Sequence, residues 1–291
     1  MENNVNNPFG DLKPELVDMA DYTVSGDGYT AISYEHKDGR RMMKLYAPYM
    51  PPSVPIQELN LARSIEALGL RVPKAIRLVT DGERLGVEFE RIVGKRSFAR
   101  AISQEPEMLE VLTARFAKAC LKLHSLPCDT QIFHSAKAHF RKMVEVSKDL
   151  SDDERARFLA FVDAVPDITT CLHGDMHIGN IITSGGVDYW IDLADFRYGD
   201  PRFDLGMLYF VCVWNENEDI SDRVFHLSHA QMLRVWDVFV KNYYGPDADR
   251  AAVDDSIRPF AALYMVHFSN REPMMPEMRK FIDNCFSSSL L

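Results

Sequence analysis

The sequence contains little cysteine, and its cysteines do not have the spacing of a disulfide framework or a metal ribbon. Its 291 residues include five cysteines, an odd number, and no Cys-x-x-Cys pair. This pattern fits neither a disulfide-stapled domain nor a zinc ribbon. A chain of this length buries a sizeable core without covalent staples. We therefore expect a globular protein in a reducing, cytoplasmic environment.

Long apolar runs and an excess of basic residues are also missing. The longest nearly apolar run, residues 205–214, is too short to span a bilayer, and the amino-terminal MENNVNNPFG lacks the regions of a signal peptide. Against 33 Lys and Arg stand 43 Asp and Glu, so the net charge is −10. A negative chain repels phosphate backbones and acidic membrane surfaces. We expect neither nucleic acid nor membrane as a partner.

Residues 1–92 have the pattern of strands interrupted by one helix. Strand-like runs flank the turn signal Asp38-Gly39, and two more runs follow later, which predicts a five-stranded antiparallel sheet. Between these groups, Ser53 is expected to cap a helix and Gly69 to end it. This part is predicted to form an amino-terminal lobe.

From about residue 103 the apolar period changes to 3.6, which indicates long helices. Ser151 and Glu154 have the spacing of a capping box, and His124 is expected to support the end of its own helix. Further helices are predicted over residues 207–213, 230–244 and 257–268. Residues 93–291 are thus predicted to form a larger, mainly helical lobe, which gives an α+β fold of two lobes.

The segment His173-Gly174-Asp175-x-His177-x-x-Asn180 carries the clearest chemical signal. An apolar run ending in Asp192 follows it, and then Gly199-Asp200-Pro201-x-x-Asp204. Carboxylate and amide oxygens suit a hard cation, and a further carboxylate suits a general base. A different interpretation stays open, because His, Asp and His at alternate positions of a strand could also bind a transition metal.

In its order and spacing this set resembles the catalytic signature of the aminoglycoside phosphotransferase and choline kinase-like family, small-molecule relatives of the protein kinases. The resemblance implies a bilobal protein kinase-like fold, with ATP and Mg²⁺ as cofactors. It also implies that Asp175 is the catalytic base or hydroxyl-orienting group, that Asn180 and Asp192 bind the metal, and that His173 and Asp204 support the loop.

Residues nearer the amino terminus also match the pattern of this family. Lys44 has apolar flanks in an expected strand, where the family lysine would reach nucleotide phosphates, and Glu58 lies closer to the middle of the apolar helical stripe than Glu66 does. Glu58 is therefore the expected partner of Lys44. The remaining residues expected at the nucleotide are Gly26 and Gly28 in a phosphate loop, Glu90 and Ile92 through their backbone at the adenine, and His177 at the phosphoryl group.

The sequence thus predicts an ATP- and Mg²⁺-dependent phosphotransferase acting on a hydroxyl of a small molecule such as an aminoglycoside, amino alcohol or sugar. Residues 100–291 hold 20 basic and 29 acidic side chains, and the acidic run 215–222 could bind a cation. An aminated acceptor is therefore one candidate. Two alternatives are a catalytically weak pseudokinase and a kinase acting on protein. The oligomeric state cannot be predicted from the sequence.

Overall fold

Residues 12–27, 30–214 and 224–288 are described by the structure, which is a computed structural model. Tertiary contacts divide the chain into a first unit, Met1–Lys95 with Ile182–Ala194, and a second unit, Arg96–Ile181 with Asp195–Leu291. The boundary at residue 92 stays a prediction. Inclusion of residues 182–194 in the first unit was not expected, because this segment lies far along the chain from the rest of that unit.

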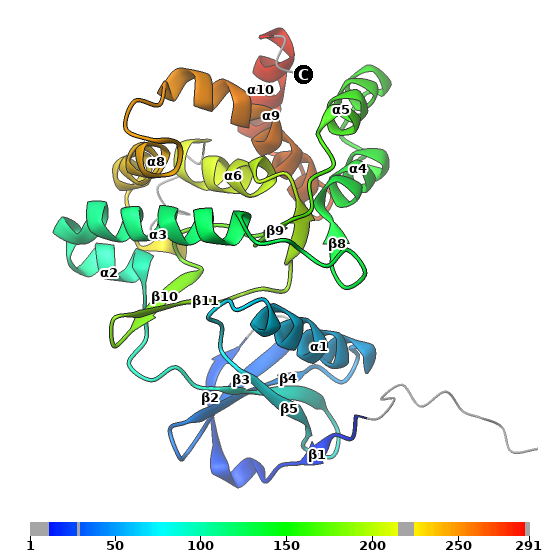
Figure 1. The fold of residues 1–291 in the computed structure, drawn as a ribbon. Coiled ribbons are helices and arrows are strands. Elements are labelled where there is room, and N and C mark those ends of the chain that lie inside the picture. Colours follow the sequence, from blue (N-terminus) through cyan, green and yellow to red (C-terminus); the bar gives the residue numbers. More distant parts are fainter. Residues whose placement is uncertain (1–11, 28–29, 215–223, 289–291) are drawn as a thin grey trace, which may run out of the picture. The chain divides into compact units, whose positions relative to one another are not determined.

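A sheet of six strands, counted within the described residues, forms the first unit in the order β1-β5-β6-β4-β3-β2 (Figure 1). Its strands are β1 (Glu15–Leu16), β2 (Tyr22–Asp27), β3 (Ala31–His36), β4 (Arg41–Tyr46), β5 (Ala75–Thr80) and β6 (Leu85–Glu90). The five predicted strands are present and antiparallel. The short β1 adds a parallel partner for β5, which the local pattern did not indicate.

In this unit the sequence predicted the turns correctly but not the residue that caps the helix. Gly39 has a φ of 72° in the β3–β4 hairpin, and Gly69 a φ of 78° just after helix α1 (Ser53–Ala67). The prediction that Ser53 caps this helix was wrong. Pro52 is the capping residue and already has helical dihedrals, so the helix begins at Ser53 without a side-chain cap.

A second segment completes the first unit. Strand β10 (Ile181–Ser184) neighbours β11 (Val187–Trp190), with Gly185 and Gly186 at positive φ in the turn between them. The amide of Trp190 donates to the carbonyl of Arg71, and the hydroxyl of Ser184 donates to the carbonyl of Val93. These bonds attach residues 182–194 to the chain around α1.

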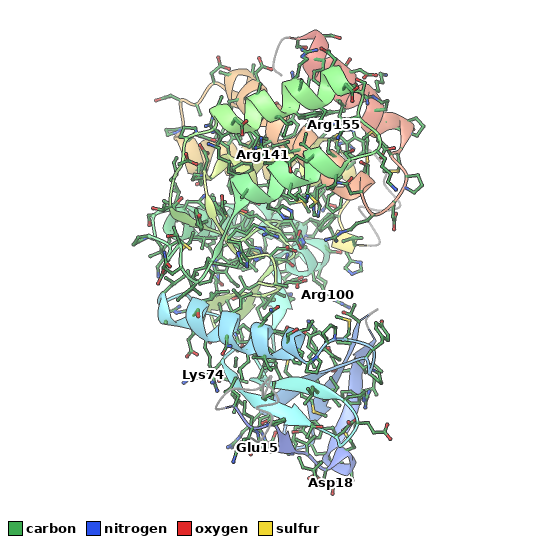
Figure 2. The ribbon with its side chains drawn as sticks, turned by 90° about the vertical axis from the view of Figure 1, so that its right-hand side faces the viewer. Glu15, Asp18, Lys74, Arg100, Arg141 and Arg155 are labelled. Carbon is green, nitrogen blue, oxygen red and sulfur yellow. The ribbon has the colours of Figure 1, made fainter. Side chains whose placement is uncertain are left out.

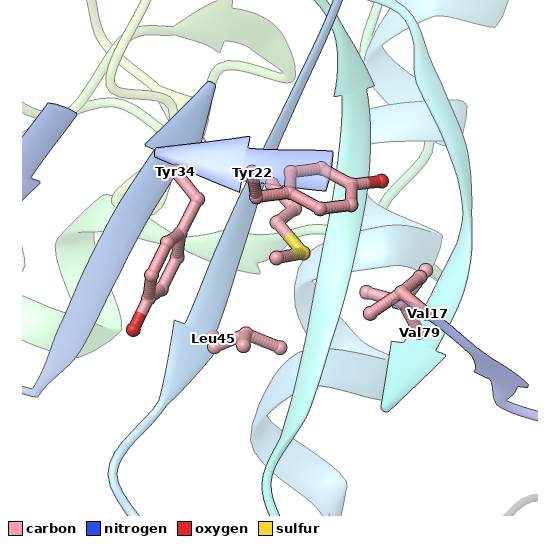
Figure 3. Packing of buried hydrophobic residues seen from close by; sticks show 6 residues of the cluster. Val17, Tyr22, Tyr34, Leu45 and Val79 are labelled. Carbon is pink, nitrogen blue, oxygen red and sulfur yellow. The ribbon is translucent and has the colours of Figure 1, made fainter. Parts of the chain in front are cut away.

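The two faces of the first sheet have different tasks. Figure 3 shows Tyr22, Tyr34, Leu45, Val17 and Val79 packed together on one face, where Leu45 is fully buried. Side chains alternate across a strand, so the neighbouring Lys44 points to the other face. On that face α1 packs on the sheet through a cluster of buried residues that consists of Leu59, Ala75, Leu78 and Val87.

Glu88 on β6 is a fully buried carboxylate with several hydrogen bonds. Its oxygens accept from the Tyr22 hydroxyl at 2.5 Å, from Arg77 Nε at 2.7 Å and from Arg41 Nη1 at 3.3 Å. Burying an ionised carboxylate is costly unless such partners surround it. The three donors come from β2, β5 and β4, so the carboxylate ties those strands to β6.

The second unit is mainly helical. Its helices are α2 (Phe98–Gln104), α3 (Leu109–His124), α4 (Ala136–Val146), α5 (Asp152–Ala164), α6 (Arg202–Tyr209), the π-helical η3 (Phe210–Trp214), α8 (His229–Tyr244), α9 (Arg250–Ser269) and α10 (Pro276–Ser287). A short 3₁₀ turn lies at Pro106–Met108, and the first unit has another at Met19–Asp21. The capping box of Ser151 and Glu154 is confirmed. The helix expected at 207–213 begins earlier and becomes π-helical, and α2, α4 and α10 were not predicted.

Short strands and close helix packing complete this unit. Strand β12 (Arg197–Gly199) pairs antiparallel with β9 (Thr170–Leu172) and parallel with β8 (His134–Ser135), while β7 is Arg96–Ser97. Figure 1 shows α6 beside α9, and Figure 2 shows α4 with Arg141 beside α5 with Arg155. A Cβ on Gly206 would lie 2.7 Å from Phe260 Cβ, so only glycine permits the contact of α6 with α9. Within the described residues, no helix is both long and apolar enough to cross a membrane.

Replacing Glu88 with Ala removes the shared acceptor of Tyr22, Arg41 and Arg77. We expect the free energy of unfolding, measured by urea denaturation, to fall by about 3 kcal/mol, because partly buried charges lose their partner. The control is Glu83→Ala at an exposed turn residue, expected to change that free energy by less than about 0.5 kcal/mol. Equal stability of the two variants would contradict the role given to Glu88.

Candidate active site

Lys44 and Glu58 form an ion pair in the first unit. Lys44 Nζ lies 3.0 Å from Glu58 Oε1, and the hydroxyl of Tyr46 donates to Glu58 Oε2. Glu66 instead lies 3.7 Å from Lys74, so Glu58 is the partner of Lys44, as expected. Tyr46 was missed, although it lies two residues after Lys44 and so points to the same face of β4. Burial and the Glu58 charge raise the pKa of Tyr46, which keeps its hydroxyl protonated to hold Glu58 in place.

A cavity of about 390 Å³ lies beside this pair. Apolar side chains such as Met42, Val72 and Phe89 form much of its lining, and Lys44, Glu58, Ser33, Lys95 and Asp192 provide the polar groups. Its size and its mixture of apolar walls with a few polar groups are typical of small-molecule sites. Asp192 has a φ of 60°, which is uncommon for a residue with a side chain and often marks a functional position.

The other residues expected at the nucleotide lie near this cavity or outside the described part. The amide of Glu90 donates to the Lys74 carbonyl, whereas the amide of Ile92 has no hydrogen-bond partner among the described residues. Neither residue lines the cavity, although their neighbour Phe89 does. Gly26 lies opposite Ser33, where a side chain would fit without a clash, and Gly28 lies outside the described residues. These roles stay predictions.

In the second unit, Asp175 lies on the loop after β9 and is partly buried. The side-chain nitrogen Nδ2 of Asn180 donates to two oxygens of Asp175, the backbone carbonyl at 2.8 Å and the carboxylate Oδ2 at 3.0 Å. Burial by itself raises the pKa of Asp175, but the nearby His177, His173 and Asn180 outweigh it and lower the pKa. The carboxylate is therefore ionised and oriented by the residue five positions later.

Asp204, in the first turn of α6, holds the backbone of this loop in place through hydrogen bonds. Its buried carboxylate accepts from the amides of His173, at 2.7 Å, and Gly174, at 2.8 Å. His124 Nε2 lies 3.1 Å from the same carboxylate, and its Nδ1 lies 2.7 Å from the Tyr243 hydroxyl. His124 lies in the last turn of α3, as expected, but its ring nitrogens contact Asp204, 80 residues away in the sequence, and Tyr243 rather than a carbonyl of its own helix. Since a carboxylate only accepts, Nε2 carries the proton.

Gly174 is required by the space around the loop. Its φ is 84°, and a side chain there would collide with the backbone of Asp195. The hydroxyl of Tyr264 on α9 donates to the Gly174 carbonyl at 3.0 Å. The backbone directly before Asp175 is thus held on both its amide and its carbonyl side.

His177 supports the loop in the structure. Its Nδ1 accepts from the amide of Gly179 at 3.1 Å, and its Nε2 lies 3.7 Å from Asp175 Oδ2. The ring of Phe225 packs edge-on against it. The expected contact of His177 with a phosphoryl group stays a prediction. Within the described ranges, no group of three His, Cys, Asp or Glu side chains could hold a metal ion, so the transition-metal interpretation gains no support.

A second cavity, of about 130 Å³, is called the Asp175 cavity because Asp175 lines it. The residues that share it with Asp175 include His139, Arg197, Tyr264, His267 and Arg271. His139 and His267 are in hydrogen-bond contact at 3.2 Å, and burial together with neighbouring arginines lowers the pKa of each to about 4. Sequence reasoning missed both, because 128 residues separate them and no local motif connects them.

Comparison with known families identifies the family to which the chain belongs. A model of the phosphotransferase enzyme family matches residues 24–239, which is most of the chain. Of the site residues named so far, only those after residue 239 lie outside the match: Tyr243, Tyr264, His267 and Arg271. The chain belongs to this family. It is therefore a phosphotransferase that acts on a hydroxyl group of a small molecule, as the sequence predicted. No curated protein sequence matched the chain.

Solved structures of other phosphotransferases have the same fold. An amicoumacin kinase in complex with AMP-PNP, Ca²⁺ and Ami is 14% identical, with a TM-score of 0.60 over 95% of this chain and 91% of that one. An apo thermostable mutant of aminoglycoside phosphotransferase APH(4)-Ia is 12% identical, with a TM-score of 0.61 over 92% and 93%. A choline/ethanolamine kinase family protein from Mesorhizobium loti is 15% identical, with a TM-score of 0.52 over 92% and 87%. The predicted protein kinase-like α+β fold is thus confirmed.

Asp204→Asn tests the brace under the phosphotransferase loop. An amide offers only one acceptor oxygen, so one of the amides of His173 and Gly174 loses its partner. We expect a loss of about 1–3 kcal/mol in the free energy of unfolding and faster hydrogen exchange of these two amides. Asp167→Asn, on an exposed side chain, is the control. Unchanged exchange at residues 173 and 174 would refute the brace.

The histidine pair predicts a pH dependence of stability. In the unfolded chain both imidazoles titrate near 6.5, whereas in the folded protein their pKa is about 4. Between these values the unfolded state binds more protons, so stability falls as the pH drops from 6.5 to about 4 and the effect vanishes above 6.5.

Thermal unfolding across this pH range checks the prediction. The double variant His139→Gln with His267→Gln should lose less of its melting temperature than the wild type over the same range. Parallel curves for the two proteins would show that the pair does not titrate as the structure indicates.

Proposed function

We propose that this phosphotransferase moves the γ-phosphoryl group of ATP to a hydroxyl of a small molecule, with Asp175 as the catalytic residue. The observation that carries the proposal is the Asp175 carboxylate itself. It is ionised, held by Asn180, placed on a loop braced by Asp204, and open to a cavity that could admit a hydroxyl group. A free carboxylate in such a place can orient a hydroxyl and receive its proton.

The proposed reaction needs only a weak base. The bond between the γ-phosphorus and the β–γ bridging oxygen breaks, a bond from the acceptor oxygen to that phosphorus forms, the hydroxyl proton passes to Asp175, and ADP leaves. Phosphoryl transfer has a loose transition state, so the proton moves late and positioning dominates the rate. The lowered pKa of Asp175 suits this order, because a weak base orients the hydroxyl without removing its proton early.

The cavity of the first unit is the proposed nucleotide site. Lys44, held by Glu58, would bind the phosphates, and apolar walls such as Val72 and Phe89 would cover the adenine. The amide of Ile92, which has no partner in the described part of the chain, and the backbone of Glu90 are proposed to meet the adenine edge. Gly26, Gly28 and His177 remain proposed contacts of the phosphates.

Magnesium fits the residues proposed for it. Both hydrogens of the Asn180 side-chain amide are used on Asp175, which leaves its oxygen as an acceptor, and Asp192 is an exposed carboxylate at the cavity wall. Oxygen ligands of these two kinds suit Mg²⁺, which keeps several waters and binds substrate phosphates as well. When bound, Mg²⁺ would neutralise charge on the phosphate oxygens.

Complexes of proteins with a similar structure support the choice of donor and acceptor. One neighbour was solved with AMP-PNP and Ca²⁺, and another with ADP and hygromycin B. All five cysteines, which lie in the described residues, are free and buried, in keeping with the proposed cytoplasmic location. We propose a small-molecule acceptor rather than a nucleic acid or a membrane.

Asp175→Asn is the decisive variant. With a hydroxyl acceptor found in a panel of amino sugars, amino alcohols, sugars and hydroxy acids, we expect ADP release to fall roughly 100- to 10,000-fold, because the proton has no receiver. The affinity for ATP, measured by calorimetry, should change by less than about twofold, because Asp175 makes no contact in the nucleotide cavity.

Lys44→Ala is the matched contrast. This variant should weaken ATP binding by about tenfold or more, because a phosphate loses its charged partner. Near-normal ADP release by Asp175→Asn would overturn the assignment of the base. Tight ATP binding by the wild type without ADP release on any acceptor would instead indicate a nucleotide-binding scaffold.

A further inference from the structure

A larger apolar cavity of the same unit lies next to the Asp175 cavity. This neighbour has a volume of about 380 Å³ and is called the Trp214 cavity, and the two cavities share Phe268 and Arg271 in their linings. A molecule with its hydroxyl at Asp175 could therefore extend past Arg271 into the Trp214 cavity. The two cavities together give an acceptor more room than the space beside Asp175 alone.

The charges around Asp175 are mostly paired with each other. Arg197 lies 2.9 Å from Asp195, and His139 and His267 are held neutral near pH 7 by their lowered pKa. Arg271 differs, because no carboxylate lies within ion-pair distance of its guanidinium in the described part of the chain. Arg271 lines the Asp175 cavity, and its charge helps to lower the pKa of both histidines.

The Trp214 cavity is built for an apolar group. The rings of Phe210 and Trp214 are stacked, with centroids 5.0 Å apart and planes at 21°, and Met275 and Met278 line the same space. Glu272 also lines this cavity but not the Asp175 cavity. The charged side chain that lines both cavities is thus the cation Arg271.

We propose that the acceptor is an anionic hydroxy compound with an apolar body, whose acidic group binds Arg271 while its body enters the Trp214 cavity. This inference rests on the proposed function of Asp175. An aminated acceptor would place its ammonium group beside Arg271, where like charges repel. A guanidinium binds a carboxylate with two hydrogen bonds and so also fixes the orientation of the acceptor. The acidic run 215–222, considered above as a cation-binding segment, lies outside the described residues.

Three probes of matched shape test the sign of the charge. Mandelate, mandelamide and 2-amino-1-phenylethanol each carry a phenyl ring and a hydroxyl, and they differ as anion, neutral amide and cation. Calorimetric titration of the full chain should show mandelate binding at least about tenfold more tightly than mandelamide, with the amine weakest. Equal or tighter binding of the amine, or no saturable binding of mandelate at about 10 mM, would overturn the proposal.

Variants of Arg271 then locate the preference. Arg271→Ala should remove the preference of about tenfold for mandelate over mandelamide, and Arg271→Glu should make the amine the tightest probe. Arg100→Ala is the matched control, because it removes an exposed arginine of the same unit that lies on α2 (Figure 2). A preference for mandelate that survives in Arg271→Ala would refute the role of Arg271.

Measuring ADP release in the same samples separates this proposal from the general one. If mandelate binds through Arg271 and its binding is lost in Arg271→Ala, the charge preference of the site is upheld whether or not ADP appears. ADP release with neutral and cationic alcohols but not with hydroxy acids would uphold the phosphotransferase mechanism and reject the anionic acceptor.

Discussion

The candidate active site depends on the hydrogen bonds of one buried carboxylate, that of Asp204. An ionised group without solvent exposure is stable only when its oxygens are fully hydrogen-bonded. Here the partners are two consecutive loop amides and a histidine whose other nitrogen is held by Tyr243. The need to satisfy this one charge therefore joins α3, α6 and α8 to the backbone directly before Asp175.

The first unit also depends on hydrogen-bonded carboxylates, one on each face of its sheet. Glu88 binds donors from three strands on one face, and Glu58 binds Lys44 and Tyr46 on the other. The first carboxylate is fully enclosed and stabilises the sheet. The second is partly exposed beside a cavity, so the lysine that it orients stays accessible to a ligand. The alternation of side chains along β4 separates these two tasks.

The net charge of the chain and the unpaired charge beside Asp175 favour acceptors of opposite sign. The chain carries −10, and most of this excess lies after residue 100, which suggested a cationic acceptor. The described groups that line the Asp175 cavity include two arginines and two neutral histidines, and one of the arginines is without an ion-pair partner there. A long-range field depends on the total charge, but binding at a few ångströms depends on which side chains the fold brings to one place.

The sequence by itself determined the features that depend on neighbouring residues. These include the turn at Gly39, the helix end at Gly69, the capping box of Ser151, and the loop on which Asn180 lies five residues after Asp175. It also identified Glu58 as the partner of Lys44, because the helical period selects one face of α1. Short-range geometry of this kind is set by dihedral preferences and periodicity.

Only the tertiary structure decided what depends on distant contacts. The parallel pairing of β1, the union of residues 182–194 with the first unit, the bond of His124 to Asp204, and the meeting of His139 with His267 leave no local pattern in the chain. The helix start at Ser53 was misjudged for a smaller reason, because Pro52 was already able to adopt helical dihedrals. Burial, which forces polar groups to find partners wherever the fold provides them, is the physical cause that sequence patterns do not contain.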